Sequence, residues 1–117
     1  MQPTTTDLLS QIASVADECA HQATNANHAA WARRARDAKY HLVTTRQWVF
    51  DGQTLIVRSA NSPTLYRVSR GTCECKAYQA GKPCWHRAAY RIVVRATDYI
   101  QWLHAAQATA QPLGKAS

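Results

Sequence analysis

The stretch that decides the fold spans residues 71–89 and reads GTCECKAYQAGKPCWHRAA. Within 14 of these residues lie three of the four cysteines and one of the five histidines, spaced as Cys73-x-Cys75, eight residues, then Cys84-x-His86. Three thiolates and one imidazole are the ligand set of a closed structural zinc site, in which four protein ligands surround the metal tetrahedrally. We therefore expect Cys73, Cys75, Cys84 and His86 to bind Zn²⁺.

The spacing of each ligand pair indicates the local structure that holds it. Cys73 and Cys75 are two residues apart, so in an extended segment both side chains point to the same side. A proline precedes the second pair and helical periodicity begins at Ala88, which predicts Cys84 in the turn before a helix and His86 in its first turn. One ring nitrogen of His86 is expected to bind the metal and the other to find a hydrogen-bond acceptor.

Two other uses of these side chains have weaker support. A redox dithiol usually has the spacing Cys-x-x-Cys, which the chain lacks. Nucleophilic catalysis by Cys84 with His86 is disfavoured, because the two residues are too close in sequence to form an oriented pair and no orienting acid is evident. We therefore expect a binding module and not an enzyme.

The order Cys-x-Cys, eight residues, Cys-x-His resembles the SWIM zinc finger, a module of chromatin-remodelling ATPases, plant transposases, recombination-associated proteins and many bacterial proteins. SWIM modules have a Tyr-x-Val strand before the first ligand pair and an aromatic residue shortly after it; Tyr66-Arg-Val68 and Tyr78 look like these features. The segment Arg87-Ala-Ala-Tyr90 resembles the helix that follows the histidine. The resemblance covers roughly residues 46–95 and implies a β-β-α arrangement around zinc.

Two positions depart from the SWIM pattern. Lys76-Ala77 stands where Pro-Asp is common, and Trp85 replaces a frequent Lys or Arg between the last two ligands. Neither position is a ligand, so the resemblance still implies zinc binding. The loss of a basic residue at Trp85 slightly weakens the case for nucleic acid, and its ring is either a stacking surface for a base or part of the core.

Apolar periodicity predicts two helices before the finger, one from Thr6 to a break at residues 25–27 and one over 28–43. Their apolar faces contain Leu8, Ile12, Val15 and Cys19 in the first helix and Trp31, Ala35, Ala38 and Leu42 in the second. We favour an antiparallel hairpin over one continuous helix. Cys19 is expected to be a small core residue.

The hydrophobic period changes after residue 45. Residues 46–50, 54–58 and 64–69 are rich in aromatic and β-branched side chains, which predicts a three-stranded antiparallel meander. Asp51-Gly52 is a strong signal for a two-residue turn in which both residues have positive φ.

A long amphipathic helix is predicted from His86 to about Ala106, with Trp102 and His104 completing the core against the first helix. The fold class is therefore α+β, with an N-terminal helical pair, a meander, a zinc knuckle and a C-terminal helix. The predicted regions are an N-terminal helical region, 1–45, a finger module with its C-terminal helix, 46–107, and a flexible tail, 108–117.

Positive charge is concentrated in the middle of the chain. The formal net charge is +7, but residues 31–95 contain 13 basic and 3 acidic residues and so carry +10. Lys and Arg that neutralise phosphates release condensed counterions, so a basic block favours a polyanionic partner. We expect low-specificity binding to nucleic acid, DNA more than RNA. The predicted contacts are Lys76, Lys82, Trp85, Arg87, Arg91, Arg95, Arg33, Arg34, Arg36 and Lys39.

The arginines of the two helices flanking the finger have alternative roles. Arg87, Arg91 and Arg95 recur every four residues and are expected to form a guanidinium stripe, which suits phosphate. The alternative is a solvated face, with Arg95 paired to Asp98. In the helix over 28–43, Asp37 lies four residues after Arg33 and suits a helix pair.

A second class of function is a protein-interaction adaptor, in which the finger docks onto a larger recombination, transposition or defence partner through the N-terminal helices. The start of the chain has no basic and apolar segments of a signal peptide, and no run of about 18 apolar residues is present. We expect an intracellular protein, in the cytoplasm or on the nucleoid, with no membrane and no small-molecule substrate among its partners.

Overall fold

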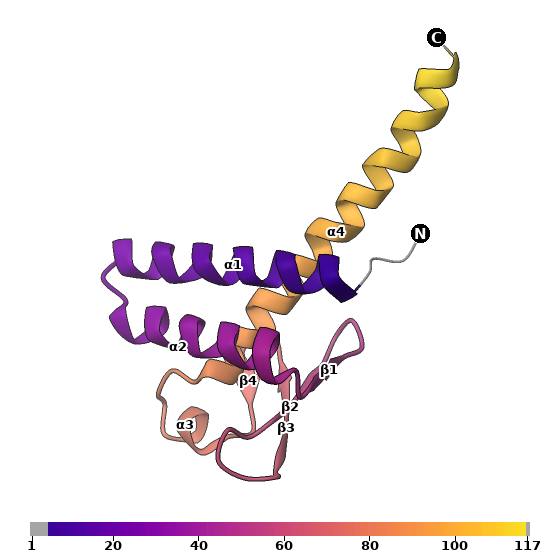
Figure 1. Cartoon of the computed structure of the whole chain (residues 1–117). Coiled ribbons are helices and arrows are strands. Elements are labelled where there is room, and N and C mark those ends of the chain that lie inside the picture. Colours follow the sequence, from indigo (N-terminus) through magenta and orange to yellow (C-terminus); the bar gives the residue numbers. More distant parts are fainter. Residues whose placement is uncertain (1–4, 117) are drawn as a thin grey trace.

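Two antiparallel helices begin the chain. In the computed structural model, which describes the backbone of residues 5–116 and the side chains of residues 7–107, α1 spans Thr5–Asn25 and α2 spans Ala29–Tyr40 (Figure 1). Between them Asn27 has a φ of 62°, a left-handed conformation that asparagine tolerates better than most residues. The predicted hairpin is therefore confirmed. Its buried small residues, which let the helices approach closely, are Ala16, Ala20, Ala32, Ala35 and Ala38.

The second helix does not continue regularly to Val43 as predicted. It ends at Tyr40 and is followed by one turn of π-helix, η1 (His41–Thr45). The backbone N–H of Arg46 donates to the carbonyl of His41 at 2.9 Å, and Arg46 itself has a φ of 58°. Near this helix end the carbonyl of Leu42 accepts the indole N–H of Trp48 at 3.0 Å, so the first strand satisfies a carbonyl near the helix terminus.

Four short strands form one antiparallel sheet in the order β1-β2-β3-β4. They are β1 (Trp48–Phe50), β2 (Leu55–Arg58), β3 (Leu65–Ser69) and β4 (Thr72–Cys73). The first three are the predicted meander. The fourth, in which Cys73 pairs with Val68, was not predicted, because two residues are too few to show a period in sequence.

The turn between β1 and β2 differs from the predicted two-residue turn. Phe50 pairs with Leu55, so four residues separate the strands, and only Gly52 of these has positive φ. The carboxylate of Asp51 accepts the backbone N–H groups of Gln53 (2.8 Å) and Thr54 (2.7 Å). The aspartate thus acts through its side chain as a local acceptor, which does not require a left-handed backbone at Asp51.

The remaining helices are α3 (Lys76–Gln79) and α4 (Trp85–Ala116). The long helix α4 crosses both α1 and α2 and packs on the sheet, while its C-terminal half extends away from the other elements (Figure 1). It runs ten residues beyond the predicted end at Ala106, and the sequence AAQATA over 105–110, which consists mainly of good helix formers, favours the first part of this extension. The predicted flexible tail, 108–117, lies outside the residues whose side chains are described.

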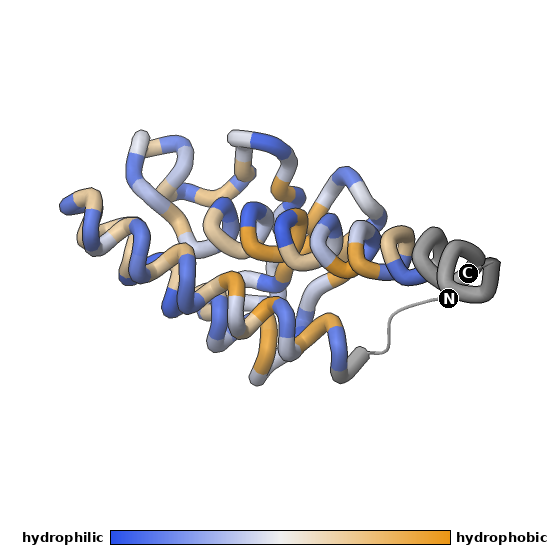
Figure 2. Tube along the Cα trace, turned by 90° about the horizontal axis from the view of Figure 1, so that it is seen from above, coloured by the Kyte–Doolittle hydropathy of each residue, from blue (hydrophilic) through white to orange (hydrophobic). Residues whose placement is uncertain are grey.

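The core lies where the hairpin, the sheet and the first half of α4 meet. The largest fully buried side chains are Ile12, Leu42, Leu55, Ile92, Val57, Val68 and Val93. Figure 2 shows apolar residues concentrated in this central region and hydrophilic residues on the outer turns of the helices. The predicted apolar faces are largely confirmed, although Cys19 and Trp31 are only half-buried at the edge of the core.

One predicted core residue is exposed. Trp102 has 63% of its surface accessible, whereas Ile100, two residues earlier on α4, is buried, so the two side chains lie on different sides of the helix. Its nearest aromatic neighbour is Tyr99, with ring centroids 6.0 Å apart. The prediction that Trp102 completes the core is therefore wrong. Across the described residues, no helix combines the length and apolar character needed to span a membrane.

Candidate metal centre

The four predicted ligands come together at one corner of the fold. Cys73 lies in β4, Cys75 is the N-cap of α3, Cys84 directly precedes α4 and His86 is the second residue of α4. Their ligand atoms all lie within 4.8 Å of one another. Extended backbone at Cys75 (φ −77°, ψ 163°) keeps its side chain beside that of Cys73, as the spacing of two predicted.

The donor set and its surroundings fit Zn²⁺. All four ligands are buried, with exposed fractions between 3% and 7%. Tetrahedral bonds of about 2.3 Å to sulfur place ligand atoms roughly 3.8 Å apart, so small side-chain rotations suffice to close the observed cluster around a metal. Three thiolates and one imidazole leave the ion no open coordination position. The centre is therefore a structural zinc site.

The imidazole of His86 gives an independent indication of a metal. Both of its ring nitrogens are buried without a hydrogen-bond partner, which is costly for polar atoms unless a metal binds one of them. The predicted acceptor for the second nitrogen is absent from the described residues. Instead, the rings of Trp85 (4.2 Å between centroids) and Tyr66 (5.0 Å) pack against the imidazole and orient it. Aromatic carbon atoms supply no acceptor, which explains the difference.

The thiols of Cys73 and Cys84 also shift each other's pKa. Interaction between the neighbouring sulfur atoms of Cys73 and Cys84 lowers the pKa of Cys84 and raises the pKa of Cys73 above its ordinary value. The backbone N–H of Arg87, at the start of α4, also lowers the pKa of Cys84. Cys73, Cys75 and Cys84 would bind Zn²⁺ as thiolates, so metal binding would release thiol protons.

Two of the arginines expected in the stripe on α4 are engaged inside the fold. The guanidinium of Arg87 lies between the rings of Trp31 (5.2 Å) and Tyr78 (5.1 Å) and so joins α2, α3 and α4. Arg95 binds α1, with one nitrogen 3.2 Å from the carboxylate of Glu18 and another 3.0 Å from the sulfur of Cys19. Arg91 alone of the three is exposed, so the continuous stripe is not formed.

The basic residues of α2 likewise include some that are held by an acidic partner and some that are exposed. Arg34 pairs with Asp37 at 3.3 Å, which corrects the predicted partner Arg33, and Lys39 pairs with Asp17 of α1 at 2.9 Å. Arg33 and Arg36 are exposed and make no ion pair with a described residue. On the finger itself, Lys76 and Lys82 are also exposed.

Trp85 has features of both predicted roles, a core residue and a stacking surface for a base. It is half-buried and stacks on His41 of η1, with ring centroids 4.2 Å apart and ring planes 21° apart. It also lines a cavity of about 400 Å³ beside the finger, together with His41 and Arg58. Sequence patterns could not indicate His41 or Arg58, because they join Trp85 only through the tertiary fold.

Comparison with known proteins identifies the segment that carries this centre. Residues 55–89, from the start of β2 to the first turns of α4, match the family model of the SWIM zinc finger. Comparison with curated proteins and with solved structures gave no significant match. The match includes Cys73, Cys75, Cys84 and His86, and it ends just after the last ligand. The chain therefore contains a SWIM zinc finger whose Cys₃His cluster is a zinc site.

Proposed function

We propose that this chain is a nucleic-acid-binding module, with DNA as its first target, in which zinc holds the binding surface in place. The observation that carries the proposal is a group of exposed cations that have no acidic partner among the residues with described side chains. Among them are the predicted contacts Arg33, Arg36, Lys76, Lys82 and Arg91. A solvated basic side chain with no internal partner is available to phosphate.

The chemistry of this surface favours backbone contacts over base-specific ones. Net charge is +7 for the whole chain, and phosphate contacts by Lys and Arg carry no sequence information. The zinc site supports this surface without taking part in it, since its four ligands are buried and leave no position for a substrate. The same closed site supports a module without catalytic activity.

A matched pair of lysine variants tests the proposal. Lys82 is free, whereas Lys39 is held by Asp17 at 2.9 Å, and Lys82→Gln and Lys39→Gln change the net charge equally. Binding of labelled duplex DNA is measured over a series of salt concentrations. We expect Lys82→Gln to reduce the slope of log affinity against log salt by about 0.9, as for one lost phosphate contact, and Lys39→Gln to leave it near the wild-type value.

Two results would contradict nucleic-acid binding by this surface. One is no binding of DNA or RNA at low salt. The other is tight binding that does not depend on salt, because an interface built on phosphate contacts must weaken as salt rises. Equal slopes for both lysine variants would exclude Lys82 as a contact.

A protein-interaction adaptor is the second candidate, and one observation favours it. Trp102 is 63% exposed and Tyr99 45% exposed, and they are three residues apart on α4, whose C-terminal half extends away from the other elements (Figure 1). Large exposed aromatic side chains are enriched at protein interfaces. If α4 is a docking helix, a protein partner recovered from nuclease-treated lysate is lost with Trp102→Ala and kept with Gln101→Ala, its exposed neighbour. A partner that both variants retain would argue against this surface.

A further inference from the structure

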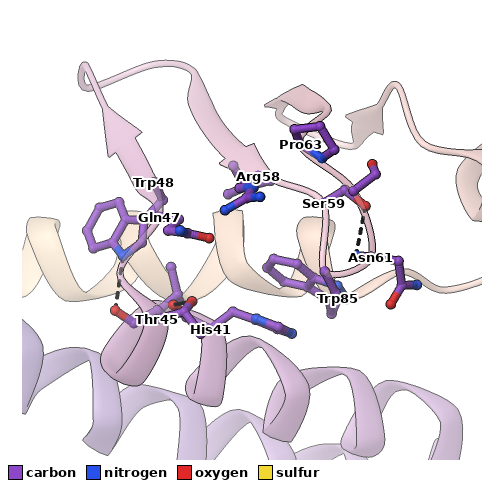
Figure 3. Close-up of a pocket in the computed structure, with 13 residues that line it drawn as sticks. His41, Thr45, Gln47, Trp48, Arg58, Ser59, Asn61, Pro63 and Trp85 are labelled. Atoms are coloured by element: carbon purple, nitrogen blue, oxygen red, sulfur yellow. Dashed lines mark hydrogen bonds between the residues drawn. The ribbon is translucent and has the colours of Figure 1, made fainter.

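Two adjoining cavities form a groove beside the zinc finger. The larger has a volume of about 400 Å³ and the smaller about 180 Å³, and Ser59, Ala60, Asn61 and Trp85 line both. The groove lies between η1 and the turn that joins β2 to β3 (Figure 3). A cavity of the larger size is within the usual range for small ligands or for one group of a larger ligand.

Aromatic rings form the floor of this groove. His41 and Trp85, from η1 and α4, stack nearly parallel at 4.2 Å, and Figure 3 shows both side chains at the cavity. Burial lowers the pKa of His41, which favours the neutral imidazole in this stack. Trp48 lines the opposite end, where its indole N–H is fixed to the carbonyl of Leu42 at 3.0 Å. The platform is therefore held in place before any ligand arrives.

The one ordinarily charged side chain of the larger cavity is basic, whereas the smaller cavity is lined by Arg34 and by the zinc ligands Cys75, Cys84 and His86. Arg58 is exposed at the larger cavity and has no ion pair with a described residue, and none of the 13 residues that line this cavity is acidic. The side-chain amides of Gln47 and Asn61 also line it, and no hydrogen bond to another described residue occupies them. Figure 3 shows Arg58 and Gln47 close together above the floor.

The backbone beneath the groove is strained. Three of the residues at the cavity, His41, Leu42 and Thr45, belong to the π-helix η1, and Arg46 just after it is left-handed with a φ of 58°. Single π-helical turns occur frequently at functional sites. A left-handed arginine costs free energy that the surrounding structure must supply, and such residues concentrate at ligand sites.

We propose that this groove binds one unpaired nucleotide of a single-stranded nucleic acid. The base contacts the rings of Trp85 and Trp48 that line the larger cavity, Arg58 contacts the phosphate, and the amides of Asn61 and Gln47 meet the edges of the base. The inference rests on the proposed nucleic-acid function and adds the type of strand. An unpaired nucleotide combines a flat ring, hydrogen-bonding edges and a negative charge, which match the three kinds of group in the groove.

A duplex cannot use this site, because its bases are stacked and paired with one another. It can still use the exposed cations of the outer surface, which contact phosphates of either form. The groove is therefore expected to add affinity for single strands only. Sequence preference should be modest, since stacking on an aromatic ring accepts every base.

Variants of the groove and of a nearby arginine test the inference. Labelled oligothymidylate and a labelled duplex of equal length are titrated with zinc-loaded wild type, Trp85→Ala, Arg58→Gln and Arg67→Gln. Arg67 is exposed on the neighbouring strand and does not line either cavity, so it is matched to Arg58 in charge. We expect Trp85→Ala to weaken single-strand binding about tenfold or more and Arg58→Gln to weaken it several-fold, with duplex binding unchanged for Trp85→Ala.

The outcomes separate this inference from the proposed function. Binding of neither strand form by the wild type would overturn both. If the wild type binds and Trp85→Ala and Arg58→Gln bind equally well, the groove inference is overturned while the proposed function stands. The same holds if the two variants weaken binding of the single strand and of the duplex equally. Equal effects of Arg58→Gln and Arg67→Gln on the single strand would also overturn the groove inference.

A direct measurement covers the case in which Trp85→Ala loses zinc. Oligonucleotides containing 5-iodouracil are irradiated with the wild-type protein, and the crosslinked residue is identified by mass spectrometry. Crosslinking to Trp85 or Trp48 is expected, since these rings line the larger cavity. Crosslinking only to Trp31 or Trp102, which lie outside it, would overturn the inference.

Discussion

The hairpin of α1 and α2 and the zinc finger of residues 55–89 are stabilised in different ways. The hairpin consists of helices of 21 and 12 residues that bury Ile12, Val15 and several alanines. Around the ligands, the finger has a strand of 2 residues and a helix of 4 residues, and the side chains it buries there are three cysteines and a histidine. Elements this short are not stable alone, so metal binding must supplement the apolar side chains that the finger buries in β2 and β3, which are Leu55, Val57 and Val68.

The two regions meet at α4, which belongs to both. Its first turn holds His86 of the zinc site, and its next turns bury Ile92, Val93 and Ala96 in the shared core. Arg87 and Arg95 then connect α4 to α2 and α1. Metal binding therefore fixes the segments that carry the zinc ligands, whereas apolar burial holds together the helices and the sheet to which these segments are attached.

Loss of a zinc ligand is expected to have the largest effect on folding, and to act mainly on the finger. Cys84→Ser, or a chelator added to wild type, is expected to unfold the finger, because metal binding in zinc-finger peptides contributes about 10–16 kcal/mol to the folded state. Helical circular dichroism should fall only in part, since the hairpin does not contain a ligand. The measurements are zinc content and NMR signals from β3 and β4.

Cys19→Ser is the control for Cys84→Ser, because Cys19 lies on α1 and binds Arg95. It should retain one zinc per chain. A chelated protein that keeps the native NMR signals of β3 and β4 would show that the finger does not depend on metal.

A cavity in the hairpin is expected to lower the stability of the fold without releasing zinc. Ile12 is fully buried in α1, so Ile12→Ala is expected to lower the free energy of unfolding by about 2–5 kcal/mol. Zinc content should remain at the wild-type level, since no ligand contacts are removed. Chemical denaturation and metal analysis check the two parts, and Ser14→Ala, an exposed change on the same helix, should have little effect. Loss of zinc in Ile12→Ala would mean that the regions fold as one unit.

Arg87 tests the connection between the regions. Its guanidinium lies 5.2 Å from the ring centre of Trp31 and 5.1 Å from that of Tyr78. Lysine keeps the charge but loses the planar stacking, so Arg87→Lys should cost about 1 kcal/mol of stability. Arg91→Lys, on the exposed side of the same helix, should cost almost nothing. Equal stabilities of the two variants in thermal unfolding would show that the stacking of Arg87 does not matter.

Much of the zinc site could be predicted from sequence, because its information is local. Two pairs of ligands with fixed spacing placed Cys73 and Cys75 on one side of an extended segment and His86 in the first turn of a helix, and the structure confirms both. The helical hairpin followed from periodicity for the same reason. What failed was the assignment of contacts between distant elements.

The errors on α4 show why contacts are harder to predict than elements. A spacing of four residues correctly places Arg87, Arg91 and Arg95 on related turns, but periodicity does not reveal which neighbour covers each one. α2 and α3 cover Arg87, and α1 covers Arg95. Likewise, Trp102 was expected to complete the core, but it is exposed although Ile100, two residues before it, is buried. The sequence of a helix does not show which of its sides a neighbouring element covers at each turn.

The smallest expected effect concerns the β1–β2 turn, which neither the metal nor the helical core holds. Hydrogen bonds from the backbone N–H groups of Thr54 and Gln53 lower the pKa of Asp51 below its ordinary value. A lowered folded-state pKa means that the carboxylate stabilises the turn above the unfolded pKa of about 3.9, and that this stabilisation is lost as pH falls through the folded value. Asp51→Asn keeps an acceptor oxygen but not the charge, so its turn should be less dependent on pH. The amide NMR shifts of Gln53 and Thr54 are followed against pH in both proteins. Zinc release at acid pH affects both alike, because both contain the same ligands, so the difference between the two titrations reports the turn. A titration of these amides at the ordinary aspartate pKa would show that the turn gains nothing from the charge, and that its geometry comes from the strands alone.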